Sequence, residues 1–549
     1  MALVFLLLSL FQPQQPPAKQ LPVAQELRSQ AVYRISGTVV DALTGQHLAR
    51  TRVFLAVVGQ EDSRNTQTNL EGKFVFQGLA PGKYRLMAQR RGYRRQAYEQ
   101  HEIFATAIVV GPGLDSEKIR FPLQPGASIS GHVLDENGEP LRQATVVLIR
   151  DGLRFGARGL QQQGQSVTND EGRYHFSHLD PGTYLVAVSA RVWYAEAVET
   201  VVSNGGPSES KHRPRQIDPA FDQTYPITFY SNASEPAGAA RLTLHSGDAE
   251  IADFLLRAVP SLHLLVRGSP DDSSRSVAGF VTESFGPGVK IPVPSPLRQV
   301  EPGLFEITGL QPGQFVVGLT LAEGGEQRTR GIPFTLSSNA EMDLADMPPS
   351  STLSGTARMA DGSALPQNAI AQLRNLSTGE TLSARIESSG AFDFRSNFNT
   401  LIPGRYEFAV FQGRYLAVSP LSATGAKLFG HVLEIAAGRD VHVSAVLSRG
   451  GTPLDGMALR NGKPAPGVLV LLIPDDPDNH PSFFRRTQSD SDGTFTLLNA
   501  FPGHYTVLAF EDGWNLEWGR SAVLEKYLPQ GESVDVAAGR KYDLKVKVQ

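Results

Sequence analysis

The stretch that decides the fold is Glu71-Gly-Lys-Phe-Val-Phe-Gln-Gly-Leu-Ala-Pro-Gly-Lys-Tyr84, because it recurs along the chain. Copies without gaps begin at Glu171, Pro302 and Asp492, and in each the first Gly lies twelve residues before the final aromatic residue. A fifth copy runs from Gly390 to Tyr406 and has four additional residues. Self-similarity of this kind is the signature of a repeat architecture.

Each part of this block has a physical meaning. The leading acidic-Gly pair predicts a tight turn in which Gly supplies a positive φ. Phe74 and Phe76 then alternate with polar residues, as in a strand with one buried face. The Pro-Gly pair predicts a second turn, with its Gly in the left-handed region. The aromatic residue opens another strand, Tyr84–Ala88 in the first copy, so the block is a strand–turn–strand unit.

A second motif lies upstream of the block in three copies. It reads Ile35-Ser-Gly-Thr-Val-Val-Asp41, and related segments occur at Ile129–Asp135 and Leu353–Met359. Each opens a strand and is followed by a Gly-containing turn. The Pro-Gly turns begin at residues 81, 181, 312, 403 and 502, so their intervals are 100, 131, 91 and 99 residues. That spacing suits one small β-sandwich per repeat.

The sequence therefore predicts an all-β chain of about five β-sandwich domains with very little helix. The expected limits are 30–125, 126–258, 259–348, 349–449 and 450–549. The long second interval predicts an inserted loop at 203–248, and apolar residues at helical spacing predict a short helix at 521–528. Short linkers are expected to keep the string extended.

Composition and charge restrict the function. The net charge is −4 and the basic residues are scattered, which does not favour nucleic-acid binding. The densest basic cluster, Arg90, Arg91, Arg94 and Arg95, indicates a solvated loop. The absence of cysteine excludes disulfides, thiolate nucleophiles and cysteine-based metal sites.

The N-terminus predicts export. An apolar run, Met1–Phe11, precedes the Pro- and Gln-rich stretch 12–18, although no Lys or Arg comes before it. This run is shorter than the roughly 20 apolar residues of a membrane-spanning helix, so 1–20 is interpreted as a signal peptide. The mature chain is expected to have no transmembrane span and to reside in the periplasm, at the cell surface or outside the cell.

These motifs resemble the carboxypeptidase regulatory-like family, in which Φ-Ser-Gly-x-Val opens the domain and Asp-Gly-x-Φ-x-Φ…Pro-Gly-x-Tyr follows. Repeats one and two match both halves. Repeat four has a stretched middle, and repeats three and five match mainly the later half; the opening Thr452-Pro-Leu-Asp-Gly456 departs from the pattern. The resemblance implies a prealbumin-like sandwich with a carbohydrate-binding-like fold that performs no chemistry itself. Tandem arrays of this kind are similar to exported bacterial proteins.

Trp514 and Trp518 are the candidate ligand-binding residues. They lie beside acidic residues in Glu511–Trp518, and exposed aromatic rings can stack on sugar faces. The alternative is that both indoles close the end of the last sandwich against the predicted helix.

No metal, cofactor or catalytic site is expected. His175 and His178 are close in sequence, but strand neighbours at odd spacing point to opposite faces. Asp475–Asn479 and Asp490–Gly493 are oxygen-rich, yet Phe501 occupies the place of the Glu that ends an EF-hand loop. The Gly-x-Ser-x-Gly motif of hydrolases does not occur.

The predicted function is a non-catalytic, exported scaffold, adhesion or binding protein. The alternatives are an array of carbohydrate-binding modules, and a regulatory partner of a peptidase or an outer-membrane receptor. The expected partners are carbohydrate or another surface protein.

Overall fold

The computed structural model describes residues 33–549 except 61, 155, 196–219, 269–278, 287, 296, 302, 324–325, 344–350, 395–400 and 413–414. The predicted signal peptide lies outside the described residues. Strands dominate the described chain, and they pair within five consecutive segments, here called sandwiches 1 to 5. The predicted all-β tandem architecture is confirmed.

Sandwich 1 has the plan that the others repeat. Its first strand lies between β4, which is antiparallel to it, and the last strand β8, which is parallel to it. The second sheet is centred on β2 and β5. The strands are β1 (Tyr33–Asp41), β2 (Arg52–Val57), β3 (Ser63–Gln67), β4 (Lys73–Leu79), β5 (Gly82–Gln89), β6 (Gln96–Ala97), β7 (Ile108–Val110) and β8 (Ile119–Leu123).

Sandwich 2 follows the same plan with a longer connection after its fifth strand. Residues 220–248, expected to be part of an inserted loop, instead contain β14, β15 and β16, and the last two pair with β13 as β6 and β7 pair with β5. The additional length therefore lies between β13 and β15. The strands are β9 (Ala127–Leu134), β10 (Thr145–Arg154), β11 (Ala157–Val167), β12 (Arg173–Leu179), β13 (Gly182–Ser189), β14 (Gln223–Thr224), β15 (Thr228–Phe229), β16 (Leu242–Leu244), β17 (Ala249–Ile251), β18 (Phe254–Leu255) and β19 (Val259–Pro260), which pairs with β14.

Sandwich 3 has two four-stranded sheets, and its first strand again runs parallel to its last. The strands are β20 (Leu262–Arg267), β21 (Gly279–Ser284), β22 (Lys290–Val293), β23 (Leu297–Glu301), β24 (Leu304–Leu310), β25 (Gly313–Glu323), β26 (Glu326–Leu336) and β27 (Ala340–Asp343).

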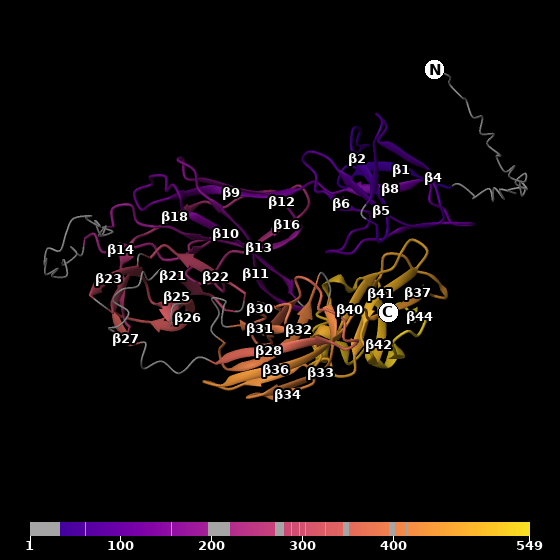
Figure 1. Cartoon of the computed structure of the whole chain (residues 1–549). Helices are drawn as coiled ribbons and strands as arrows, with labels where there is room; N and C mark the ends of the chain where they lie inside the picture. The colour runs from indigo at the N-terminus through magenta and orange to yellow at the C-terminus, as the bar shows by residue number, and fades with distance from the viewer. Residues whose placement is uncertain are drawn as a thin grey trace, which may run out of the picture.

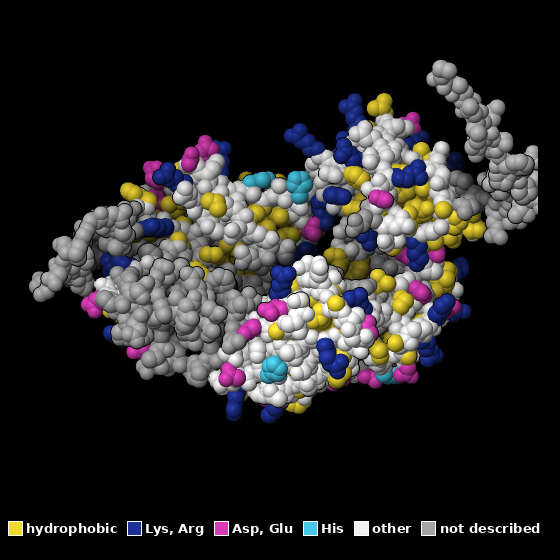
Figure 2. Space-filling model, viewed as in Figure 1, with side chains coloured by type: hydrophobic (Ala, Val, Ile, Leu, Met, Phe, Trp, Pro, Cys, Tyr) yellow, Lys and Arg dark blue, Asp and Glu magenta, His cyan; other side chains and the backbone are white. Residues whose placement is uncertain are grey.

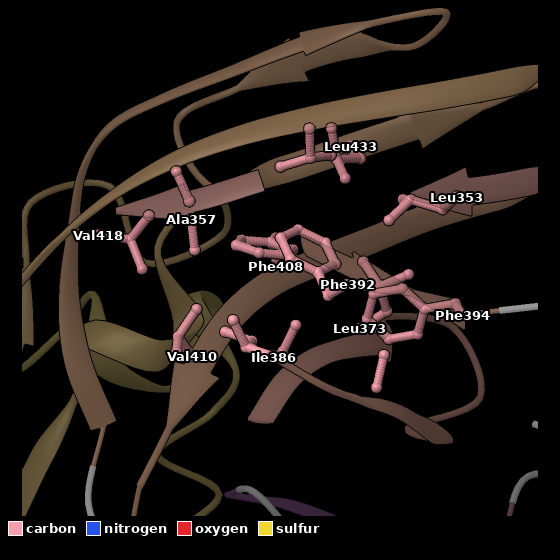
Figure 3. Packing of buried hydrophobic residues seen from close by; sticks show 14 of the residues in the cluster. Leu353, Ala357, Leu373, Ile386, Phe392, Phe394, Phe408, Val410, Val418 and Leu433 are labelled. Atoms are coloured by element: carbon pink, nitrogen blue, oxygen red, sulfur yellow. The ribbon is translucent and has the colours of Figure 1, made fainter. Parts of the chain in front are cut away.

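Sandwich 4 joins its two sheets through one strand. β33 pairs with β32 near its start and with β36 along the rest of its length. Figure 3 shows the core between the sheets, with Phe392, Phe394 and Phe408 at its centre. The strands are β28 (Thr352–Met359), β29 (Ile370–Asn375), β30 (Thr381–Arg385), β31 (Ala391–Asp393), β32 (Gly404–Phe411), β33 (Tyr415–Thr424), β34 (Lys427–Phe429), β35 (Val432–Ile435) and β36 (Asp440–Ser448).

The described part of sandwich 5 contains short helical segments. One follows β39, and the others follow β42. The predicted helix 521–528 is shorter than expected: α1 covers Ser521–Leu524, and a 3-10 turn, η5, covers Leu528–Gln530. The other elements are β37 (Thr452–Arg460), β38 (Lys463–Pro464), β39 (Leu469–Pro474), η3 (Pro481–Phe483), β40 (Arg485–Gln488), β41 (Thr494–Ala500), β42 (Gly503–Phe510), η4 (Gly513–Asn515), β43 (Glu532–Val536) and β44 (Asp543–Lys547).

The glycine of the opening motif is explained by the parallel last strand. A Cβ on Gly37 would lie 2.1 Å from the carbonyl oxygen of Ile119, and one on Gly131 would lie 2.1 Å from that of Ala252. Gly456 has the same relation to Leu544 in sandwich 5. The opening of the fifth repeat, which departs from the pattern in sequence, thus places its glycine in the same structural position.

The structure confirms the backbone conformation predicted for the first glycine of the turn block but not the turn geometry predicted for the second. Gly72 has φ 70°, as predicted. Gly82 and Gly182 also have positive φ, 159° and 152°, but these values differ from the roughly 80° of the left-handed position in a type II turn. The reason is that β5 and β13 already begin at these glycines. The aromatic residue closes the turn, since the Tyr84 hydroxyl donates to the Ala80 carbonyl oxygen at 2.9 Å.

The five sandwiches do not form an extended string. Figure 1 shows sandwiches 1 and 2 along one side and sandwiches 4 and 5 along the other, with sandwich 3 joining them at one end. The C-terminal sandwich therefore returns to the first, and hydrogen bonds connect the two. The expectation of an extended chain is wrong, because the linkers turn and the domains contact each other directly.

Candidate functional site at the domain junctions

The two tryptophans predicted to bind a ligand lie at contacts between sandwiches. Trp514 stacks on His101 of sandwich 1, with ring centroids 4.6 Å apart and an interplanar angle of 2°. Trp518 is 9% exposed and packs in one cluster with Leu524 of α1. The Arg486 guanidinium lies 4.6 Å from the centroid of the Trp518 ring. Binding of carbohydrate by this pair stays a prediction.

An ion pair connects sandwiches 1 and 5. Lys83 Nζ lies 2.5 Å from Asp490 Oδ2, and Asp490 is buried. Burial raises the pKa of the Asp490 carboxyl group, while the hydrogen bond from Lys83 acts in the opposite direction. The Ala107 N–H also donates to Asp490 Oδ1 at 3.3 Å. Asp490, which the sequence marks only as part of an oxygen-rich segment, is therefore a contact residue between the two ends of the chain.

Gln488 extends the same junction. Its Nε2 donates to the Glu99 carbonyl oxygen at 2.7 Å and to Thr106 Oγ1 at 2.8 Å. Its Oε1 lies 3.2 Å from Nδ1 of His101, the residue that stacks on Trp514. Gln488 and Thr106 are both buried. Because buried polar groups are costly unless each finds its partner, this junction specifies one relative placement of the two sandwiches.

The hairpin β10–β11 of sandwich 2 reaches sandwich 5 with its tip. The Gly519 N–H donates to the Gly156 carbonyl oxygen at 2.9 Å. A Cβ on Gly156, which has φ 78°, would lie 2.6 Å from Trp518 Cδ2. Only glycine fits at this tip, because both the backbone angle and the indole exclude a side chain.

Sandwiches 2 and 3 share an apolar junction. Ile149, Leu185 and Phe229 of sandwich 2 pack in one buried cluster with Val289 and Ile291 of sandwich 3.

A histidine bridges two carboxylates beside this junction. His263 Nδ1 lies 2.9 Å from Glu306 Oε1, and its Nε2 lies 2.9 Å from Asp222 Oδ2. The hydrogen bond to Glu306 is the main reason that the pKa of His263 is raised, while burial opposes it. Both ring nitrogens are occupied, so this arrangement connects segments and does not present a free base.

Sandwiches 4 and 5 meet around a second histidine. Burial lowers the pKa of His431 to about 4, and the neighbouring His480 of sandwich 5 contributes. The ring centroids of the two histidines are 5.7 Å apart. Beside them, the Ser482 N–H donates to Oε1 of Glu407, and Arg374 forms an ion pair with the same carboxylate at 2.6 Å.

Several clefts open between the sandwiches, and two of them adjoin sandwich 4. The larger, of about 870 Å³, lies between sandwiches 2, 3 and 4 and is lined by Gln162, Phe334 and Thr381 among others. The smaller, of about 600 Å³, lies where sandwiches 2 to 5 meet and is lined by Phe484 and Trp518 among others.

The described residues form no metal site. No three His, Cys, Asp or Glu side chains among them are grouped so as to hold an ion. In the first oxygen-rich segment, Asn479 Nδ2 donates a hydrogen bond to Asp476 Oδ2 at 3.0 Å. In the second segment, Asp490 forms an ion pair with Lys83. The structure does not bring the two segments together at one ion. His175 and His178 both lie within β12, and His178 has φ 57°.

The visible surface carries charges of both signs. Figure 2 shows Lys and Arg interspersed with Asp and Glu over the described part of this face. In the described part of the chain, no helix has the length and apolar character needed to cross a membrane.

Sequence reasoning missed the junction residues His101, Gln488 and Gly156. A lone His, Gln or Gly carries no pattern, because its role depends on a sandwich hundreds of residues away. The apolar junction did leave a signal, namely the uninterrupted run Leu185-Val-Ala-Val188.

The fold and these junctions define a tandem β-sandwich protein whose domains are packed on one another. The family model of the carboxypeptidase regulatory-like domain matches residues 34–122 and 128–211. The model thus matches two tandem copies, in sandwich 1 and in the first part of sandwich 2, and for these two repeats it confirms the resemblance seen in the sequence. A search of curated proteins by sequence gives no match.

Solved structures with some similarity include several pilins. The Bacillus anthracis TIE protein is 12% identical, with 77% of this chain and 76% of that one covered and a TM-score of 0.17. A streptococcal ancillary pilin is 11% identical, with 57% and 99% covered and a TM-score of 0.17. BcpA, the major pilin subunit of Bacillus cereus, is 9% identical, with 77% and 99% covered and a TM-score of 0.14. TM-scores of this size do not establish a shared overall arrangement.

Proposed function

We propose that the chain is a non-catalytic, exported scaffold or binding protein that holds five β-sandwiches in one closed arrangement. The observation that supports this most is the junction of the first and last sandwiches, where the buried Gln488 and Asp490 make polar contacts, that of Asp490 with the partly exposed Lys83. Contacts of this kind fix the domains relative to one another. A fixed array can bind a partner through several domains at once, with less ordering cost than a flexible string.

We also propose the domain limits 30–125, 126–258, 259–348, 349–449 and 450–549, which follow the repeat. Pulling single molecules by their two ends tests the limits and the scaffold together. The expected record is one rupture of the closed junction followed by five unfolding events. Each event should lengthen the chain by roughly 33–36 nm for about 100 residues. Fewer events, or no rupture before the first unfolding event, would contradict the proposal.

Export is tested separately on intact cells of the native host. Protease added outside, or to cells with a permeabilised outer envelope, should digest the chain while a cytoplasmic marker protein stays intact. Protection of both proteins until the cells are lysed would contradict export.

A further inference from the structure

The larger of the two clefts, here called the central cleft, is built from three sandwiches. Gln162 lies on β11 of sandwich 2, Thr335 on β26 of sandwich 3 and Thr381 on β30 of sandwich 4, and all three line it. Its volume of about 870 Å³ is within the range of ligand-binding pockets. The cleft therefore exists only because the domains pack on one another.

The lining of the central cleft combines polar and apolar side chains and carries no net charge. Lys290 and Glu380 are the only charged side chains among its described lining residues, and they pair with each other at 2.8 Å. The side-chain amides of Gln162 and Gln314 and the hydroxyl of Thr335 line the same space. A polyanion would need unpaired basic groups, and a lipid would need a continuous apolar wall. This lining suits a ligand rich in uncharged hydroxyl groups.

Phe334 is one of the aromatic residues in the apolar part of the lining. Phe334 is half-buried and stacks on the buried Phe315, with centroids 5.3 Å apart and an interplanar angle of 21°. Both residues line the central cleft. A supported ring beside hydrogen-bonding groups is the arrangement that receives the C–H face of a sugar while its hydroxyls are bonded at the edge.

A second cleft adjoins the central cleft on the side of sandwich 5. Asn375 and Thr378 line both clefts, and Phe484 and Trp518 line the smaller one. Trp518 is one of the two residues that the sequence marks as candidates for ligand binding.

We propose that the central cleft binds a neutral oligosaccharide, with Phe334 as the stacking surface and Gln162, Thr335 and Thr381 as hydrogen-bonding groups. This goes beyond the scaffold proposal and does not depend on it, because a closed array could serve as a scaffold without binding sugar. Loss of this site would leave the pulling experiment unchanged.

The test is affinity electrophoresis and calorimetry of the full chain with a panel of glycans. The panel contains neutral β-glucan, xylan and mannan fragments, with polygalacturonate and heparin as polyanions and a pool of unstructured peptides. Binding of at least one neutral glycan is expected. The variant Gln162→Ala should weaken that binding about three- to tenfold, as the loss of one hydrogen bond does. Thr335→Trp, which fills the cleft from an exposed strand position, should abolish it.

The matched control is Gln163→Ala, because Gln163 is exposed on the same strand and is not among the residues that line the cleft. It should leave the affinity unchanged, and unaltered thermal unfolding of each variant confirms its fold. Binding of no neutral glycan, preference for a polyanion or a peptide, or equal affinities in the wild type and Thr335→Trp would each overturn the proposal.

Discussion

The strands β5 and β13 occupy the same place in two successive sandwiches, yet only one of them is buried on both faces. In β5, buried Tyr84, Leu86 and Ala88 alternate with more exposed residues, of which Arg85 is one. In β13, every residue from Tyr184 to Ser189 is buried.

The difference arises from what covers the outer face. Leu185 and Ala187 of β13 pack against Val289 and Ile291 of sandwich 3, whereas the matching position in β5 carries Arg85. Sheets buried on both faces read as continuous apolar runs, and half-buried sheets alternate. Loss of alternation in one copy of a repeat therefore marks the face on which another domain packs.

The same rule applies in sandwich 5. The outward residues Leu508 and Phe510 of β42 pack with Trp518 and Leu524 in one buried cluster. There the covering layer is the segment around α1 and the tip of the β10–β11 hairpin rather than a whole sheet.

The largest effect is expected when the matching residues of β5 and β13, Arg85 and Leu185, are exchanged. Leu185→Arg places the residue of sandwich 1 in the covered face of sandwich 2 and should cost about 3–5 kcal/mol, since it buries an unpaired charge. Arg85→Leu makes the reverse change on an exposed position and should alter stability by less than about 0.5 kcal/mol. Scanning calorimetry of the full chain measures both. Equal effects would show that the outer face of β13 is not covered.

Acid should weaken the junction of sandwiches 4 and 5. Burial keeps the His431 ring uncharged to about pH 4, whereas an unfolded histidine titrates near 6.5. The unfolded state therefore binds more protons between these values, and stability falls as pH falls from 6.5 toward 4, by about 2–3 kcal/mol. Calorimetry across this pH range should show the loss in the wild type and not in His431→Gln.

His442→Gln is the control, because His442 is exposed on the neighbouring strand β36. It should keep the acid sensitivity of the wild type. An acid response that survives in His431→Gln would assign the effect to other groups.

The smallest expected effect is at the junction of sandwiches 1 and 5. Lys83→Met leaves the buried Asp490 without its cation and should weaken the junction by about 1–2 kcal/mol, since Lys83 is partly solvated. The loss should appear as faster hydrogen exchange at the Ala107 and Val109 amides. These amides donate to Asp490 Oδ1 and Ser491 Oγ across the junction.

The control is Lys73→Met, which removes an exposed ion pair within sandwich 1. Exchange at the two junction amides should not change in this variant. Faster exchange in Lys73→Met, or unchanged exchange in Lys83→Met, would show that the Lys83–Asp490 ion pair does not stabilise the junction.

Local structure was predictable from the sequence to the extent that it depends on local residues. Gly72 and the alternation of Phe74 and Phe76 specify a turn and a half-buried strand without reference to other domains. The Gly456 opening was missed because its role appears only when β44 lies parallel to it.

The candidate site was less predictable, since it depends on the packing of whole domains. Trp514 and Trp518 were identified as large aromatics near acidic groups, but nothing in their own segment indicates His101 or Gly156 as their neighbours. The central cleft has no sequence motif, because its walls come from three sandwiches.

Small-angle X-ray scattering of the full chain tests the closed arrangement most directly. A compact chain of this length has a radius of gyration of about 24 Å, and a linear string of five 100-residue domains would have about 50 Å. The closed arrangement predicts a value below about 35 Å. A value near 50 Å would contradict the docking of the last sandwich on the first.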